Sequence, residues 1–208
     1  MLEKNTIELL SQGLKQLNLA DTSLDKLLAF VTLLEKWNKT YNITAIRDVE
    51  QMVIYHLLDS ATVYRYLNGN SIIDVGTGGG IPGIIFAIIN PQLNVTLLDS
   101  NQKKTRFLRY AQRQLNLTNI TVVCQRVEDY QPQTGFDVVI SRAFSEVGQF
   151  LQLAGHLCAS DGKVLAMKGP RIESEQNSKQ IGFRLIEEIS LNVPFLDAVR
   201  RLLIFKKI

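Results

Sequence analysis

The spacing of hydrophobic and polar positions along this chain changes near residue 71. Before that point, apolar side chains recur at helical intervals behind the polar stop Asp21-Thr22-Ser23. The pattern predicts a helix from Leu24 to about Trp37 and, after a break at residues 38–47, a second helix over 49–66. We therefore expect a helical N-terminal cap over residues 1–66.

From Ser71 onward, short apolar runs alternate with helical segments, which is typical of βαβ units and a mostly parallel sheet. The predicted strands cover residues 71–75, 94–98, 120–124, 136–141 and 162–168. The predicted helices between them cover residues 83–90, 101–116 and 146–159. Two later runs, Phe183–Leu191 and Arg201–Lys206, favour an antiparallel pair at the far side of the sheet. Residues 67–208 are thus predicted to form a doubly wound, Rossmann-like α/β domain.

Composition narrows the class of protein. Hydrophobic residues make up 46% of the chain and charged residues 21%, which is ordinary for a globular protein. The two cysteines are far apart and have only two histidines as companions, so we expect neither a disulfide framework nor a metal site. No apolar run approaches the roughly 20 residues that span a bilayer, and we expect a cytoplasmic monomer. The net charge of +3 permits a nucleic-acid partner.

A glycine-rich segment, Asp74 to Gly83, carries the strongest chemical signal. It joins a predicted buried strand to a helix, where glycines allow a sharp turn and a close approach of the backbone to a ligand. Gly78, Gly80 and Gly83 satisfy GxGxxG, a pattern that also fits a dinucleotide site. Asp74, two residues before Gly76, makes the segment resemble motif I of S-adenosylmethionine-dependent methyltransferases. By that resemblance, Asp74 and the loop hold the methionine part of the cofactor.

Two further segments are candidates for the rest of the cofactor. Asp99 ends the next predicted strand, where a carboxylate can accept hydrogen bonds from both ribose hydroxyls. The alternative is a solvated aspartate that caps the following helix. Residues 126–129 follow the third predicted strand, where methyltransferases of this fold hold the adenine, and the alternative there is an ordinary polar loop.

Several motifs together resemble the bacterial small-subunit ribosomal RNA guanine-N7 methyltransferases, also called the glucose-inhibited division protein B family. The resemblance covers nearly the whole chain. Its motifs are Trp37–Thr44, Arg47-Asp48, His56–Ser60, Asp74–Gly83, Leu97–Ser100, Ile140–Phe144 and Met167–Gly169. It implies methyl transfer from S-adenosylmethionine to N7 of one guanine in 16S rRNA, with the RNA or the 30S particle as partner.

The same resemblance implies a set of cofactor contacts. Asp74, Gly78 and Asp99 are supported by the general arguments on the fold, and the family adds Gly76, Ile81, Val127, Glu128 and Arg142. The family varies between its loop glycines, and Gly79 and Ile81 stand at such variable places here.

N7 of guanine has a free lone pair and loses no proton on methylation, so this reaction needs positioning rather than a general base. Arg142 follows the fourth predicted strand and Lys168 ends the fifth, beside the crevice where such sheets bind ligands. Either could grip O6 of guanine or a phosphate. The alternative for each is a strand-end charge in water. We interpret His56 as a hydrogen-bonded interface residue rather than a catalyst.

A basic helical face is the candidate RNA contact. Residues 101–113 contain five basic side chains and no acid, and helical spacing leaves Lys103, Arg106 and Arg113 on a positive stripe. The alternative is a solvated helix face. Trp37 and Tyr41 could stack on a base, although core packing is the preferred interpretation.

Two other functions remain open from the sequence. A nicotinamide-dependent oxidoreductase would use Gly78, Gly80 and Gly83, but it leaves Asp74 without a role and lacks a substrate domain. A noncatalytic RNA-binding or assembly protein could retain the same fold, and only an activity assay would separate it from the enzyme.

Overall fold

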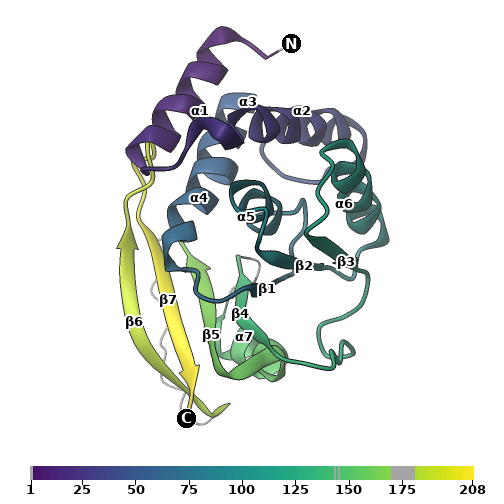
Figure 1. Ribbon diagram of the computed structural model, residues 1–208, viewed down its shortest axis with the longest axis vertical. Coiled ribbons are helices and arrows are strands. Elements are labelled where there is room, and N and C mark those ends of the chain that lie inside the picture. The colour runs from purple at the N-terminus through teal and green to yellow at the C-terminus, as the bar shows by residue number, and fades with distance from the viewer. Residues whose placement is uncertain (1, 143, 145, 170–180) are drawn as a thin grey trace.

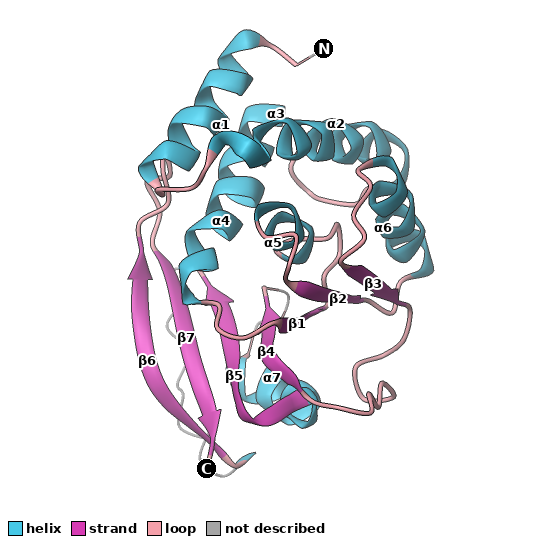
Figure 2. Cartoon of the chain, viewed as in Figure 1, coloured by secondary structure: helices cyan, strands magenta, loops and turns pink. Residues whose placement is uncertain are grey.

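The computed structural model describes residues 2–142, 144, 146–169 and 181–208. They form a seven-stranded sheet with helices on both faces, and the N-terminal helices gather beside one of these faces (Figure 1). Figure 2 shows that the regular elements of the described chain before β1 are all helices. The described ends of the chain lie at opposite ends of the molecule.

The N-terminal helices agree with the predicted spacing, with two differences. They are α1 (Lys4–Gln16), α2 (Leu24–Tyr41), α3 (Val49–Met52), η2 (Val53–Leu58) and α4 (Asp59–Val63), with short 3₁₀ turns η1 (Asp21–Ser23) and η3 (Tyr64–Tyr66). The first difference is that α2 continues past the predicted end at Trp37. It ends at Tyr41, and the next residue, Asn42, adopts a left-handed backbone with φ of 51°, a conformation that commonly terminates helices.

The second difference lies in residues 49–66, where we predicted one helix. Within this segment, η2 is wound as a π-helix, with α-helical turns on either side. A π-helix bonds residues five apart instead of four, and such turns occur often at functional sites. A hydrophobic spacing of three to four residues does not reveal one locally widened turn.

The sheet has the predicted class and topology. Its strands are β1 (Ser71–Val75), β2 (Asn94–Leu98), β3 (Ile120–Val123), β4 (Phe136–Ser141), β5 (Cys158–Lys168), β6 (Phe183–Leu191) and β7 (Arg200–Lys207). Their order is β3-β2-β1-β4-β5-β7-β6. The first five run parallel, and β7 pairs antiparallel with both β5 and β6. The mostly parallel sheet and the antiparallel pair at its far side are thereby confirmed.

The helices between the strands are α5 (Gly83–Ile89), α6 (Gln102–Gln114) and α7 (Val147–Ala154), followed by the 3₁₀ turn η4 (Gly155–Leu157). The prediction that the last helix reaches residue 159 is wrong, because β5 already begins at Cys158. At Gly155 a Cβ would lie 2.5 Å from the ring of Phe183, so glycine lets this ring, at the start of β6, pack directly against the backbone of η4.

Successive residues of β1 face opposite sides of the sheet and enter different cores. Ile72 belongs to the cluster that contains α5, α6 and the N-terminal helices, whereas Ile73 belongs to the cluster beneath α7. Leu14, Leu34 and Leu57 of the N-terminal helices are fully buried in the first cluster. One hydrophobic core therefore joins these helices to the sheet. None of the described helices has the length and apolar character needed to cross a membrane.

Candidate functional site

The glycine-rich loop leaves β1 and returns as α5. Its backbone is fixed to the neighbouring strand, because the amides of Gly76 and Thr77 donate to the carbonyl of Leu98 at 2.8 and 3.1 Å. Gly78 has a φ of +59°, a left-handed conformation that favours glycine. At Gly83 a Cβ would lie 2.3 Å from Leu97, so glycine permits α5 to pack directly on β2.

Asp74 ties the strand, the loop and the helix together. Its side chain is fully buried, and Oδ2 accepts hydrogen bonds from the hydroxyl of Thr77 at 2.6 Å and from the amide of Gly83 at 2.8 Å. Burial raises the pKa of Asp74 to about 6 against these two hydrogen bonds. Within the described part of the chain, Oδ1 is buried without a hydrogen-bond partner. Asp74 thus fixes both ends of the loop through Oδ2, and Oδ1 still has the capacity to accept a hydrogen bond.

Asp99 holds the other side of the same loop. One carboxylate oxygen accepts from the amide of Gly78 at 2.9 Å, and the other accepts from the amide of Asn101 at 2.8 Å. The Lys104 ammonium lies 4.0 Å away. Each carboxylate oxygen can accept a second hydrogen bond, so Asp99 both fixes the tip of the loop and can bind a hydroxyl group.

A crevice of about 410 Å³ opens beside the loop at the carboxyl ends of the first strands. Among the residues predicted to contact a cofactor, Gly76, Asp99, Val127 and Glu128 line this crevice. Gly78 is joined to it through Asp99. The other lining residues are Val75, Leu98, Ser100, Lys104, Gln125, Arg126, Phe144, Gln149 and Leu153.

Besides Gly78, three predicted cofactor residues are absent from the lining of this crevice. Asp74 is behind the loop, as described above, and Ile81 is buried in the hydrophobic core that contains the N-terminal helices. Arg142 lines a different cavity. The structure therefore divides the predicted set into wall residues, residues that support the loop, and one residue of a second site.

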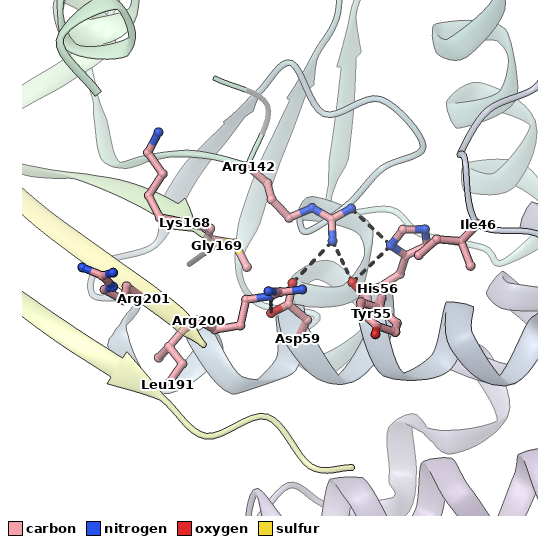
Figure 3. A pocket seen from close by; sticks show the side chains of 11 residues that line it. Ile46, Tyr55, His56, Asp59, Arg142, Lys168, Gly169, Leu191, Arg200 and Arg201 are labelled. Carbon is pink, nitrogen blue, oxygen red and sulfur yellow. Dashed lines mark hydrogen bonds and ion pairs between the residues drawn. The ribbon is translucent and has the colours of Figure 1, made fainter. Parts of the chain in front are cut away.

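The second cavity, of about 330 Å³, lies at the carboxyl ends of β4 and β5 and brings the two predicted substrate-positioning residues, Arg142 and Lys168, into one site (Figure 3). Its described charged lining is four basic residues and one acidic residue: Arg142, Lys168, Arg200, Arg201 and Asp59. The remaining walls are Ile46, Tyr55, His56, Met167, Gly169 and Leu191.

Arg142 spans from β4 to the N-terminal helices. Its Nη1 donates to the carbonyl of Tyr55 at 2.8 Å and lies 3.5 Å from Oδ2 of Asp59, while Nη2 lies 3.2 Å from Nδ1 of His56 (Figure 3). Burial lowers the pKa of Arg142, and the charges of Asp59 and Asp74 oppose that shift. The guanidinium is thus held in one orientation by helix η2 and the start of α4.

His56 is buried and serves as a hydrogen-bonding partner, as the sequence interpretation proposed. Nε2 of His56 lies 2.8 Å from Oγ1 of Thr44, and Nδ1 lies 3.2 Å from both Nη2 of Arg142 and the carbonyl oxygen of Tyr55. Burial, followed by the charge of Arg142, lowers the pKa of His56 to about 3. The imidazole is therefore neutral at physiological pH.

The segment after β4 separates the two cavities. Arg142 lines the charged cavity, and Phe144 lines the crevice and stacks on Phe150 with ring centroids 5.1 Å apart. Lys168 donates from Nζ to the carbonyl of Phe144 at 3.1 Å, so it joins the two sites. Ala143, part of the motif noted in the sequence, lies outside the described residues.

On α6, the predicted basic stripe of Lys103, Arg106 and Arg113 is exposed. Arg106 and Arg113 line a hollow of about 430 Å³, and the structure adds Arg109 to it. Trp37 packs against Tyr41, Phe107 and Tyr110 with centroid distances of 5.0, 5.5 and 5.2 Å. The packing of Trp37 connects α2 to α6.

Sequence reasoning missed Asp59 and Arg200 as site residues. Asp59 was visible as the one carboxylate between Met52 and Tyr64, in a helical stretch rich in apolar side chains, which is a usable signal for a buried charge with a partner. Arg200 follows an irregular stretch, and no local pattern distinguishes it from Arg201. Only the pairing of β7 with β5 brings it to the cavity.

Comparisons with known proteins give a consistent result. The sequence profile of a family described as rRNA small subunit methyltransferase G matches residues 23–204. The Ribosomal RNA small subunit methyltransferase G of Methylobacillus flagellatus is 47% identical over 196 residues, covering 93% of this chain and 94% of the relative. The protein of that name from Legionella pneumophila subsp. pneumophila is 56% identical over 161 residues, covering 77% of each chain.

Among solved structures, a SAM dependent methyltransferase from Aquifex aeolicus is similar to this chain with a TM-score of 0.62 and 15% sequence identity. The similarity covers 79% of this chain and 96% of the other. At that identity it bears on the fold alone, and it confirms the predicted Rossmann-like methyltransferase fold.

Proposed function

Because this chain belongs to the rRNA small subunit methyltransferase G family, we propose that it transfers a methyl group from S-adenosylmethionine to N7 of one guanine in 16S rRNA. The observation that carries this proposal is the pair of cavities on either side of the segment after β4. One has a glycine loop and an acidic strand end, and the other has a cationic lining.

The crevice fits the cofactor in size and chemistry. Its volume of about 410 Å³ falls in the usual range for small-molecule sites, and it combines apolar walls with a few polar groups. In our proposal Asp99 accepts the ribose hydroxyls, and Val127 and Glu128 hold the adenine. Gly76 forms the wall along the methionine part, and Gly78 supports that wall through its hydrogen bond to Asp99. Asp74 and Ile81 support the loop, and Oδ1 of Asp74, which has no hydrogen-bond partner among the described residues, is a further acceptor. When bound, S-adenosylmethionine supplies the electrophilic methyl group.

The charged cavity fits the edge of a guanine. N7 and O6 are both hydrogen-bond acceptors, and Arg142, Lys168 and Arg200 are donors. A donor on O6 or on a neighbouring phosphate leaves the N7 lone pair available for transfer. No proton leaves N7, so the reaction does not need His56 as a base. The lowered pKa of His56 agrees with a role other than proton transfer. Positioning then supplies the main catalytic contribution.

The basic face of α6 is proposed to contact the RNA backbone. Lys103, Arg106 and Arg113 are exposed on one helix, and such side chains bind phosphates without regard to sequence. Arg109 extends this surface, since it lines the same hollow as Arg106 and Arg113.

The direct test is methylation of unmethylated 30S particles and of free 16S rRNA with labelled S-adenosylmethionine. Mass spectrometry of nuclease fragments would locate the modified base, and a 7-methylguanine is expected. Label at another atom would overturn the proposed position. Absence of label together with tight RNA binding would favour the noncatalytic alternative. A parallel titration with NADH should show no binding, in contrast to S-adenosylmethionine.

A further inference from the structure

Asp59 stands where three separate parts of the chain meet. It begins α4 and its side chain is almost completely buried. One carboxylate oxygen lies 3.5 Å from Nη1 of Arg142, after β4, and the other lies 3.4 Å from Nε of Arg200, at the start of β7 (Figure 3). The two arginines approach the carboxylate from different strands and form part of the wall of the cationic cavity.

Tyr55 lies one helical turn before Asp59 and holds the same two arginines. Its backbone carbonyl accepts the hydrogen bond from Nη1 of Arg142 at 2.8 Å. Its ring lies under the guanidinium of Arg200, 5.9 Å from centroid to Cζ. Tyr55 is in the π-helical segment, whose widened winding replaces the ordinary α-helical bonding pattern at this position. Tyr55 and Asp59 of the N-terminal helices therefore each contact both arginines.

The carboxylate of Asp59 offsets the repulsion between two guanidinium groups, those of Arg142 and Arg200. Two guanidinium groups in one cavity repel each other, and each has a long side chain with many rotamers. Burial raises the pKa of Asp59, while the charges of Arg142 and Arg200 act against that shift. Since the remaining described charged groups lining the cavity are also basic, Asp59 offsets part of a strongly positive surface without removing it.

Building on the function proposed above, we propose that Asp59 is a positioning residue for methyl transfer. Its carboxylate holds Arg142 and Arg200 at the orientation in which they bind the target guanine. Asp59 acts through the arginines and not on the reacting atoms. On this proposal, the N-terminal helices contribute positioning residues to the target site in addition to their packing in the core.

The first test compares Asp59→Asn with the wild type in single-turnover methylation of 30S particles. We expect the rate to fall by about 100-fold, the size of effect that a small displacement of a positioning group produces. Binding of S-adenosylmethionine, measured by calorimetry, should be unchanged because Asp59 does not line the crevice. Asp161→Asn, the same change at an exposed aspartate of β5, is the matched control and should keep the wild-type rate.

Two arginines without their carboxylate could prevent Asp59→Asn from folding, so a second variant is included. Asp59→Asn combined with Arg200→Gln removes one of the opposing cations. If Asp59 acts through Arg142 and Arg200, Asp59→Asn should slow the Arg200→Gln variant less than it slows the wild type, because only the effect through Arg142 is left. The proposal is overturned if the rate losses of the two single variants multiply in full in the double variant. It is also overturned if Asp59→Asn methylates at the wild-type rate, or if it loses cofactor affinity as strongly as it loses methylation.

A third measurement separates this proposal from the proposed function. Nitrogen-15 NMR of the arginine Nε–H groups reports how well each guanidinium is held, whether or not the protein methylates RNA. In the wild type we expect slow hydrogen exchange for Arg142 and Arg200, and faster exchange in whichever Asp59 variant folds. Unchanged exchange would overturn the holding role. An inactive wild type with well-held arginines would contradict only the proposed reaction.

Discussion

Oδ2 of Asp59 lies 3.5 Å from Nη1 of Arg142, although 83 residues separate the two in the chain. The pair connects the N-terminal helices to the central strand that ends between the two cavities. Arg142 is consequently fixed from the side opposite its own strand. Substitutions at such residues should therefore affect the reaction more than they affect the fold.

Replacement of Asp99 by Ala should weaken binding of S-adenosylmethionine by about 1.5–3 kcal/mol, the usual contribution of hydrogen bonds to a charged group. The substitution removes the proposed ribose acceptor and also the acceptor for the amide of Gly78. Isothermal titration calorimetry would measure the change, with the exposed Asp161→Asn as control. Wild-type affinity in the Asp99 variant would exclude Asp99 from the cofactor site.

Replacement of Arg142 by Ala should cost about 2–4 kcal/mol of transition-state stabilisation, comparable to the loss of one preorganised donor. The loss should appear mainly in the single-turnover rate, since Arg142 lines the charged cavity and not the crevice proposed for the cofactor. Cofactor titration checks that the variant is folded. A nearly normal rate would show that the contacts of Arg142 are purely structural.

Simultaneous replacement of Lys103, Arg106 and Arg113 by Ala should reduce the salt dependence of RNA binding. For single-stranded RNA, each lost phosphate contact lowers the slope of log affinity against log salt by roughly 0.7. Filter binding at several salt concentrations would measure the slope. Lys4, Lys15 and Lys26, which are exposed on α1 and α2, provide a control of equal charge change. Equal slopes for the wild type and the stripe variant would leave these side chains as a solvated helix face.

The pH dependence of stability should carry the signature of His56. Its pKa is lowered to about 3 in the folded protein, so the unfolded chain takes up a proton below pH 6.5 that the folded chain does not. This contribution to stability is complete above pH 6.5 and is lost as the pH falls toward 3. Between pH 6 and 5 the wild type should lose about 1 kcal/mol more stability than His56→Gln.

Urea unfolding at several pH values would measure this difference. Comparison with the variant matters because Asp74, with its pKa raised to about 6, contributes with the opposite sign at acidic pH. In the activity assay, a neutral His56 also predicts no rising limb near pH 6–7. Parallel stability curves for the two proteins, or an activity limb that disappears in His56→Gln, would contradict this assignment.

Local patterns predicted the parts of the molecule that local forces determine. The runs 71–75 and 94–98 were identified correctly because both faces of these strands are buried. Asp99 was expected at a crevice because parallel strands end at one edge of the sheet, and it does line one there, whereas its contact with a cofactor stays a prediction. The π-helical turn at Tyr55 was invisible, since it changes the spacing by only one residue. Asp59 and Arg200 meet through strand order, and no local pattern encodes that order.

The place of β7 in the sheet has a consequence for how the molecule is assembled. β6 comes before β7 in the chain, yet among the described strands it joins the sheet only through β7. The backbone of β6 is therefore hydrogen-bonded into the sheet only when β7 is in place. The crevice walls come from residues 75–153, whereas the wall containing Arg200 arrives with β7. Chain order thus places all the crevice walls within one contiguous segment of the sequence, whereas the charged cavity is complete only once the last strand is in the sheet.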